Sequence, residues 1–91
     1  MAATGFDKRP AVGQMISGDS VTGTLTISGF QWYGATTAAH TCTVTDTAGN
    51  VVWASSVSAA GEAPNGFWNF QREVLGLSVT MGSGTLLVYL E

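Results

Sequence analysis

The stretch that decides the fold reads His40-Thr41-Cys42-Thr43-Val44-Thr45, then Asp46-Thr47-Ala48-Gly49-Asn50, then Val51-Val52-Trp53-Ala54. Polar and apolar residues alternate in the first segment, so Cys42 and Val44 share one face of an extended strand. The loop between the two runs contains an Asp and a Gly-Asn pair, and Gly49 can adopt the positive φ that a tight turn requires. The sequence therefore predicts a β-hairpin over residues 40–54.

The segment before this hairpin has the same period of two. In residues 21–27 the apolar side chains fall on one face and the threonines on the other, which is typical of a half-buried strand. After Gly29 the phase changes, because Phe30 and Trp32 are now the large apolar positions. A glycine at a change of phase predicts a bulge or a bend in the strand.

Further strands are expected after the hairpin. A loop rich in Gly, Pro and Asn spans residues 61–66, and extended segments follow at 67–70 and 74–81. The last segment, 85–90, is apolar on both faces, so we expect it to lie inside a sheet or under a neighbouring subunit. Six or seven short strands with turns between them predict an all-β protein: a small single-domain β-sandwich or jelly-roll-like barrel.

Composition limits the function classes. The 91 residues are 45% hydrophobic and only 10% charged, with a net charge of −3, which fits one folded domain and excludes a disordered chain. Three basic residues are too few to neutralise a phosphate track, so no nucleic-acid partner is expected. The first residues lack the apolar core of a leader peptide, and no long apolar run follows. We therefore expect synthesis in the cytoplasm and no membrane partner.

Residues 1–20 differ from the rest. They hold two of the three basic residues and few apolar anchors, so we expect an N-terminal arm followed by a β-sandwich domain over 21–91. Phe6, Arg9 and Met15 are the arm residues expected to contact a partner, for example by adding a strand to a sheet edge. A simple first strand of the domain remains an equal alternative for this segment.

Candidate chemistry is sparse. A single cysteine excludes an internal disulfide and a Cys-based zinc site. His40 and Cys42 share a strand face, but no third group orients them, and a structural role is expected for both. The six acids are scattered, and no pair suited to glycoside hydrolysis stands out. The sequence therefore predicts a protein that is no enzyme and needs no cofactor or metal.

Aromatic pairs are the best candidates for binding. Trp32-Tyr33 and Phe67-Trp68 are neighbours in sequence, and neighbours on a strand point to opposite faces. One member of each pair is expected to face outward in a domain with a single core, unless loops or the arm cover it. Outward aromatics suit a protein interface or a sugar-stacking surface. We favour the protein interface, because few amide groups lie nearby.

Four segments, 27–37, 42–53, 76–80 and 84–90, together resemble small virion proteins of tailed bacteriophages. The shared motifs are structural: a D-x-x-G-N hairpin at 46–50 and a terminal G-T-L-x-V-Y-L strand. The resemblance implies a capsid decoration or cement protein that resides in the virion and binds the major capsid protein or neighbouring virion proteins as a trimer or dimer. Two alternatives stay open: a tail, fibre or adaptor component of the virion, and a small carbohydrate-binding module.

Overall fold

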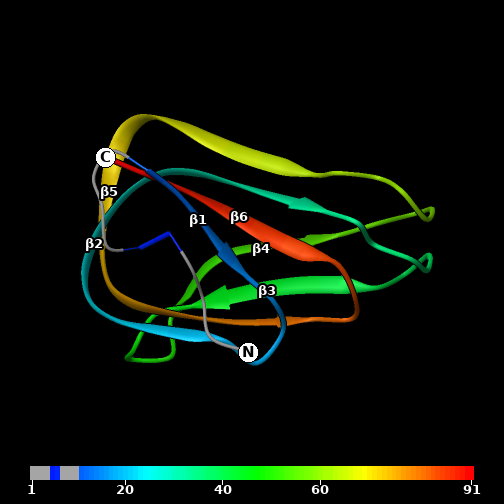
Figure 1. Ribbon diagram of the computed structural model, residues 1–91, viewed down its shortest axis with the longest axis horizontal. Coiled ribbons are helices and arrows are strands. Elements are labelled where there is room, and N and C mark those ends of the chain that lie inside the picture. The colour runs from blue at the N-terminus through cyan, green and yellow to red at the C-terminus, as the bar shows by residue number, and fades with distance from the viewer. Residues whose placement is uncertain (1–4, 7–10) are drawn as a thin grey trace.

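The chain folds as a sandwich of β-strands without any helix among the described residues (Figure 1). The computed structural model describes residues 5–6 and 11–91, except for the side chains of residues 11 and 68–71. The strands are β1 (Ala11–Met15), β2 (Ser20–Tyr33), β3 (Thr41–Thr45), β4 (Val51–Ser56), β5 (Asn65–Met81) and β6 (Thr85–Leu90). The expected all-β sandwich is thus confirmed.

Two long strands build both layers. The six strands form one antiparallel sheet in the order β1-β6-β2-β5-β3-β4. The second half of β2 and the first half of β5 belong to a layer with β6 and β1. The first half of β2 and the second half of β5 belong to a layer with β3 and β4. Both long strands bend sharply where they pass from one layer to the other (Figure 1).

A bulge lies at one of these bends. The pairing of β2 with both neighbours shifts between Ile27 and Gly29. Leu25 and Ile27 point into the core before the shift, and Phe30 and Trp32 point into it afterwards. One extra residue therefore exchanges the strand's two faces, as the change of phase in the sequence predicts.

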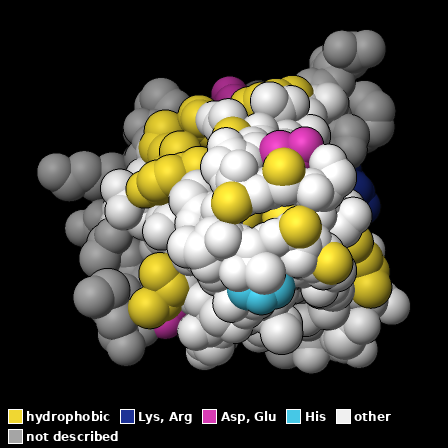
Figure 2. Space-filling model, turned by 90° about the vertical axis from the view of Figure 1, so that its right-hand side faces the viewer, with side chains coloured by type: hydrophobic (Ala, Val, Ile, Leu, Met, Phe, Trp, Pro, Cys, Tyr) yellow, Lys and Arg dark blue, Asp and Glu magenta, His cyan; other side chains and the backbone are white. Residues whose placement is uncertain are grey.

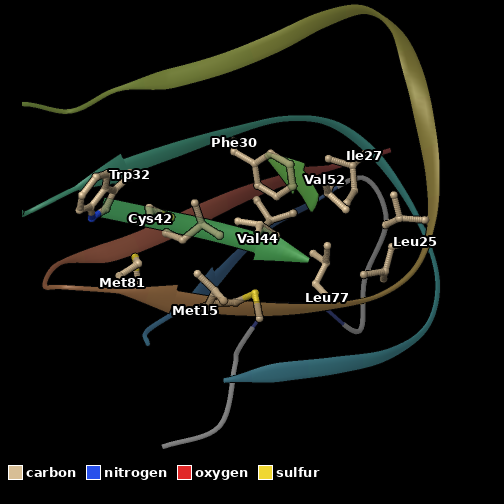
Figure 3. Packing of buried hydrophobic residues seen from close by; sticks show 14 of the residues in the cluster. Met15, Leu25, Ile27, Phe30, Trp32, Cys42, Val44, Val52, Leu77 and Met81 are labelled. Carbon is tan, nitrogen blue, oxygen red and sulfur yellow. The ribbon is translucent and has the colours of Figure 1, made fainter. Parts of the chain in front are cut away.

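The core fills the space between the two layers (Figure 3). Trp32 and Phe30 are its largest fully buried side chains, and both come from the second half of β2. Trp53 of the opposite layer stacks on Phe30, with ring centroids 5.5 Å apart and an interplanar angle of 15°. Cys42 and Val44 of β3 point into the core beside Phe30 and Trp32, on the same strand face, as the alternation of the hairpin predicts.

Part of the expected arm belongs to the sheet. Residues 11–15 form β1, which pairs in antiparallel register with β6, from Ala11 opposite Leu90 to Met15 opposite Leu86. Met15 is 1% exposed, and Phe6 packs against the core from the edge, where its ring covers Gly13. Strand β6 consequently lies between β1 and β2, the interior position that its two apolar faces predict.

Candidate binding surface

One face of the layer containing β1, β6, β2 and the start of β5 presents apolar side chains to solvent. The register aligns Val12, Tyr89, Gly29 and Phe67 in one row across these four strands. Val12 is 46% exposed and Phe67 is 54% exposed, whereas the neighbours of Tyr89 along β6 are buried. The row therefore runs along the outer side of the sandwich.

A glycine at the centre of this row gives an aromatic ring its place. A Cβ atom at position 29 would overlap the ring of Phe67 and lie 2.7 Å from the carbonyl oxygen of Gly66. The ring thus covers the backbone of Gly29 and reaches Tyr89 on the far side, with ring centroids 5.1 Å apart and a tilt of 57°. This arrangement holds the exposed ring of Phe67 and the half-buried ring of Tyr89 in a defined geometry.

The adjoining rows complete the surface. Gln14, Leu87, Gln31 and Asn65 are aligned across the same four strands, and Tyr33 lies opposite Thr85. Tyr33 is 41% exposed. We refer to the five apolar members of these rows as the outer apolar face: Val12, Tyr33, Phe67, Leu87 and Tyr89. None of the residues in the three rows carries a charge.

The loop end of the sandwich is different in character. Its hydrophobic atoms form several separate areas among polar side chains and backbone (Figure 2). Ser83 joins the loops there: its hydroxyl oxygen lies 2.8 Å from Nδ1 of His40 and accepts the N–H of Thr36 at 2.9 Å. The Ser83 carbonyl accepts the indole N–H of Trp32 at 2.8 Å. These bonds fasten the 34–40 loop to the turn between β5 and β6.

The two residues considered as a nucleophile and a base do not act together. His40 bonds to Ser83, whereas Cys42 is fully buried in the core. Burial raises the pKa of the Cys42 thiol from 9.0 to about 12, so the thiol stays protonated at neutral pH. Cys42 therefore acts as a small hydrophobic residue.

The described acids stabilise turns. The Asp46 carboxylate accepts the backbone N–H groups of Asn50 at 2.9 Å and Ala48 at 3.0 Å, and these bonds hold its pKa below the usual value. Glu62 accepts the N–H and the hydroxyl of Ser58 at 2.7 and 2.8 Å, which also lowers its pKa. In the part of the chain that the structure describes, no three His, Cys, Asp or Glu residues could hold a metal ion together.

The structure divides the seven residues predicted to contact a partner. Trp32 and Met15 are buried in the core because β2 and β1 turn these side chains inward, and Phe6, which precedes β1, packs against the core. Tyr33 and Phe67 lie on the outer apolar face, so the first aromatic pair splits between core and surface as expected. Arg9 and the side chain of Trp68 lie outside the described residues.

Sequence reasoning missed Val12, Leu87 and Tyr89 as surface residues. The signal was present in the last strand, whose second apolar face predicted either an interior position or contact with a neighbour. Both conditions can hold together, since β6 has a strand on each side and still turns Tyr89 outward.

Among the described residues, no helix is long and apolar enough to span a membrane.

Comparison with known families gives one match. The family model described as an immunoglobulin-like domain of bacterial spore germination, Gmad2, matches residues 9–91. No curated protein and no solved structure matches the chain. The match begins inside the segment expected to be an arm and includes all six strands.

This match overturns the resemblance to bacteriophage virion proteins. The prediction of a capsid decoration protein located in the virion, and the alternatives set beside it, were wrong. Their motifs, a tight hairpin and a terminal strand rich in apolar residues, follow from the needs of a small β-sandwich. Such motifs recur in unrelated sandwiches and identify no particular role.

Proposed function

The chain belongs to the family of immunoglobulin-like domains of bacterial spore germination, and we propose that it serves there as a non-catalytic domain that binds another protein. The outer apolar face is the proposed contact surface. The carrying observation is the row in which Val12, Tyr89 and Phe67 lie exposed or half-exposed side by side, with no charge in the two rows towards Tyr33.

The size of the face indicates what kind of complex it supports. Four strands about 4.8 Å apart span about 20 Å, and three rows about 7 Å apart span about 20 Å along the strands with their side chains, which gives a patch of roughly 400 Å². The patch combines apolar side chains with the amides of Gln14, Gln31 and Asn65, a mixture that is typical of interfaces between separately folded proteins. Pairing it with a partner buries roughly 800 Å² in total, which is typical of a transient contact.

The chemistry of the described residues supports a binding role. The one thiol is buried and protonated, and the histidine fastens two loops. Asp46 and Glu62 each cap a turn with their carboxylates, one before β4 and the other after it. Tyrosine and phenylalanine, by contrast, are residue types enriched in protein interfaces.

Photo-crosslinking in sporulating cells tests the proposal. A photoreactive phenylalanine analogue placed at Phe67 should give one dominant adduct with another protein. The matched control position is Leu75, which is 60% exposed on the other layer and should give none. Val12→Glu should abolish the adduct and slow germination, whereas Leu75→Glu should do neither.

Folding of each variant is checked by thermal melting followed by circular dichroism. Equal adducts from positions 67 and 75, or normal germination with folded Val12→Glu, would contradict the proposal.

A further inference from the structure

Strand β4 forms the outer edge of its layer, and half of its backbone groups point away from the sheet. It pairs only with β3 in the sheet order. The N–H of Val57 bonds to the His40 carbonyl at 3.1 Å, and the Val57 carbonyl accepts the N–H of Ala39 at 2.8 Å. Because the direction of these groups alternates along a strand, Ser55 also faces β3, whereas Ala54 and Ser56 face outward.

Strand β3 shows the matching alternation. Thr41, the register partner of Ser56, turns its carbonyl to β5, where it accepts the N–H of Gly82 at 3.0 Å. The N–H and C=O groups of Ala54 and Ser56 therefore form the open part of the edge. In the described part of the chain these four groups pair with no other strand.

The open part of this edge carries no charge or proline, and the bulge of the β3–β4 pair lies before it, at Val52. Residues 51–56 read VVWASS and contain neither a charged residue nor a proline. Ala54 and Ser56 are exposed and small, so they allow another backbone to approach closely. An open, uncharged edge of this kind is a template for an added strand.

The open stretch has a defined end on each side. Before it, the Val52 carbonyl accepts a hydrogen bond from Nη1 of Arg72 at 3.4 Å. After it, the N–H of Ser58 donates to Oε1 of Glu62 at 2.7 Å. Within the described part of the chain, Ala54, Ser55 and Ser56 thus form the segment of β4 whose outward backbone groups bond to no other strand.

We propose that two copies of the chain pair through this segment, antiparallel about a twofold axis at Ser55. Ala54 of each copy then lies opposite Ser56 of the other, and each such pair exchanges two hydrogen bonds. All four open groups of each copy form hydrogen bonds at once, because each outward N–H of one copy then lies opposite an outward C=O of the other. A strand in another register would leave some of these groups unpaired.

The same register brings opposite charges together. Val52 of one copy lies opposite Ser58 of the other, so the guanidinium bonded to the Val52 carbonyl approaches the carboxylate bonded to Ser58. Arg72 of each copy therefore faces Glu62 of its partner, twice by symmetry. This complementarity, together with the matched length of the open stretch, favours a second copy as the occupant of the edge.

The dimer is expected to be weak. Pairing of three residues on each side buries far less than the roughly 1,200 Å² of a stable interface. Sedimentation equilibrium from about 10 μM to about 1 mM should show a mass rising from 9.4 kDa towards twice that value. A mass that stays at 9.4 kDa throughout would overturn the proposal.

Edge variants test the location. Ala54→Pro removes an outward N–H that forms no bond within the sheet, and Ala54→Lys places a charge on the edge. Both should remain monomeric over the whole concentration range while keeping the circular dichroism of the parent chain. Leu75→Lys adds the same charge on the exposed surface of another strand and should dimerise normally. Equal effects of Ala54→Lys and Leu75→Lys would refute the assignment.

A charge exchange tests the register. Arg72→Glu and Glu62→Arg alone should each weaken dimerisation by about threefold to tenfold, because like charges then face each other. The double variant should restore it to within about twofold of the parent. Failure of the double variant to recover would refute the twofold axis at Ser55. The outer apolar face plays no part here, so Val12→Glu should dimerise as the parent does.

Discussion

Replacing Trp32 by phenylalanine tests the account of the core most directly. Trp32 is fully buried, and its indole N–H donates to the Ser83 carbonyl at 2.8 Å. Loss of that bond costs about 1 kcal/mol, and the smaller ring loses burial and leaves a void worth about 1–2 kcal/mol. The free energy of unfolding should therefore fall by about 2–3 kcal/mol, which lowers Tm by roughly 10–20 °C in a domain of this size.

Chemical denaturation and calorimetry measure this loss, and the neighbouring residue supplies the control. Tyr33→Phe removes a hydroxyl from an exposed side chain and should change the free energy of unfolding by less than about 0.5 kcal/mol. Trp32→Phe should also remove a blue-shifted component of the tryptophan emission, because Trp32 is fully buried. A folded Trp32→Phe variant within about 0.5 kcal/mol of the parent would refute the reasoning, because neither the hydrogen bond nor the packing would then contribute as the structure indicates.

Three further predictions concern other parts of the fold. The Cys42 thiol should resist alkylation at pH 8 in the native state and react at once in denaturant, and rapid native labelling would contradict its burial. Because its pKa is raised from 9.0 to about 12, the contribution of this thiol to stability should stay constant below about pH 9 and fall as pH rises from there. Asp46→Ala should lower Tm at pH 7 and reduce the loss of stability on acidification. The pKa of Asp46 is depressed in the folded state, so its contribution to stability disappears as pH falls through that pKa. If Tm falls with decreasing pH in the variant as it does in the parent, this role of Asp46 is contradicted. Gly76→Ala should cost about 2–4 kcal/mol by denaturant titration, since φ is +76° and a Cβ would meet Thr47 Oγ1 and lie 2.9 Å from the Val21 carbonyl oxygen. Gly18→Ala, at φ +91° but with open space around it, should cost only about 1–2 kcal/mol, and equal losses at both positions would show that the close contacts at Gly76 are unimportant.

Local signals in the sequence predicted the hairpin and the bulge well. Asp46 and Gly49 determine their turn by bonds within five residues, and the change of phase after Gly29 is visible in a short window. The continuity of β5 was missed: segments 67–70 and 74–81 belong to one strand that turns the corner between the layers. No local pattern distinguishes a bend within a strand from a break between two strands.

The candidate surface depends on contacts that are distant in sequence. Phe67 covers Gly29, and Tyr89 meets the same ring, so the face exists only once three strands are in register. The adjacent pair Trp32-Tyr33 predicted that one ring faces outward, which the structure confirms. The resemblance to virion proteins misled because it rested on turn and strand motifs that the demands of a small sandwich explain.

The position of β1 beside β6 governs how the domain responds to tension applied at its two ends. Ala11 lies opposite Leu90, so the chain enters and leaves this strand pair at the same end of the ladder. A pulling force on both ends therefore loads the hydrogen bonds between β1 and β6 one after another, like a zipper, instead of shearing all of them together. The pair should open at low force, and its opening withdraws Met15 from the core and exposes Leu86, Val88 and Leu90 along the edge of β6. In this geometry, a mechanical load frees the edge of β6 for pairing with another strand before the remaining strands separate.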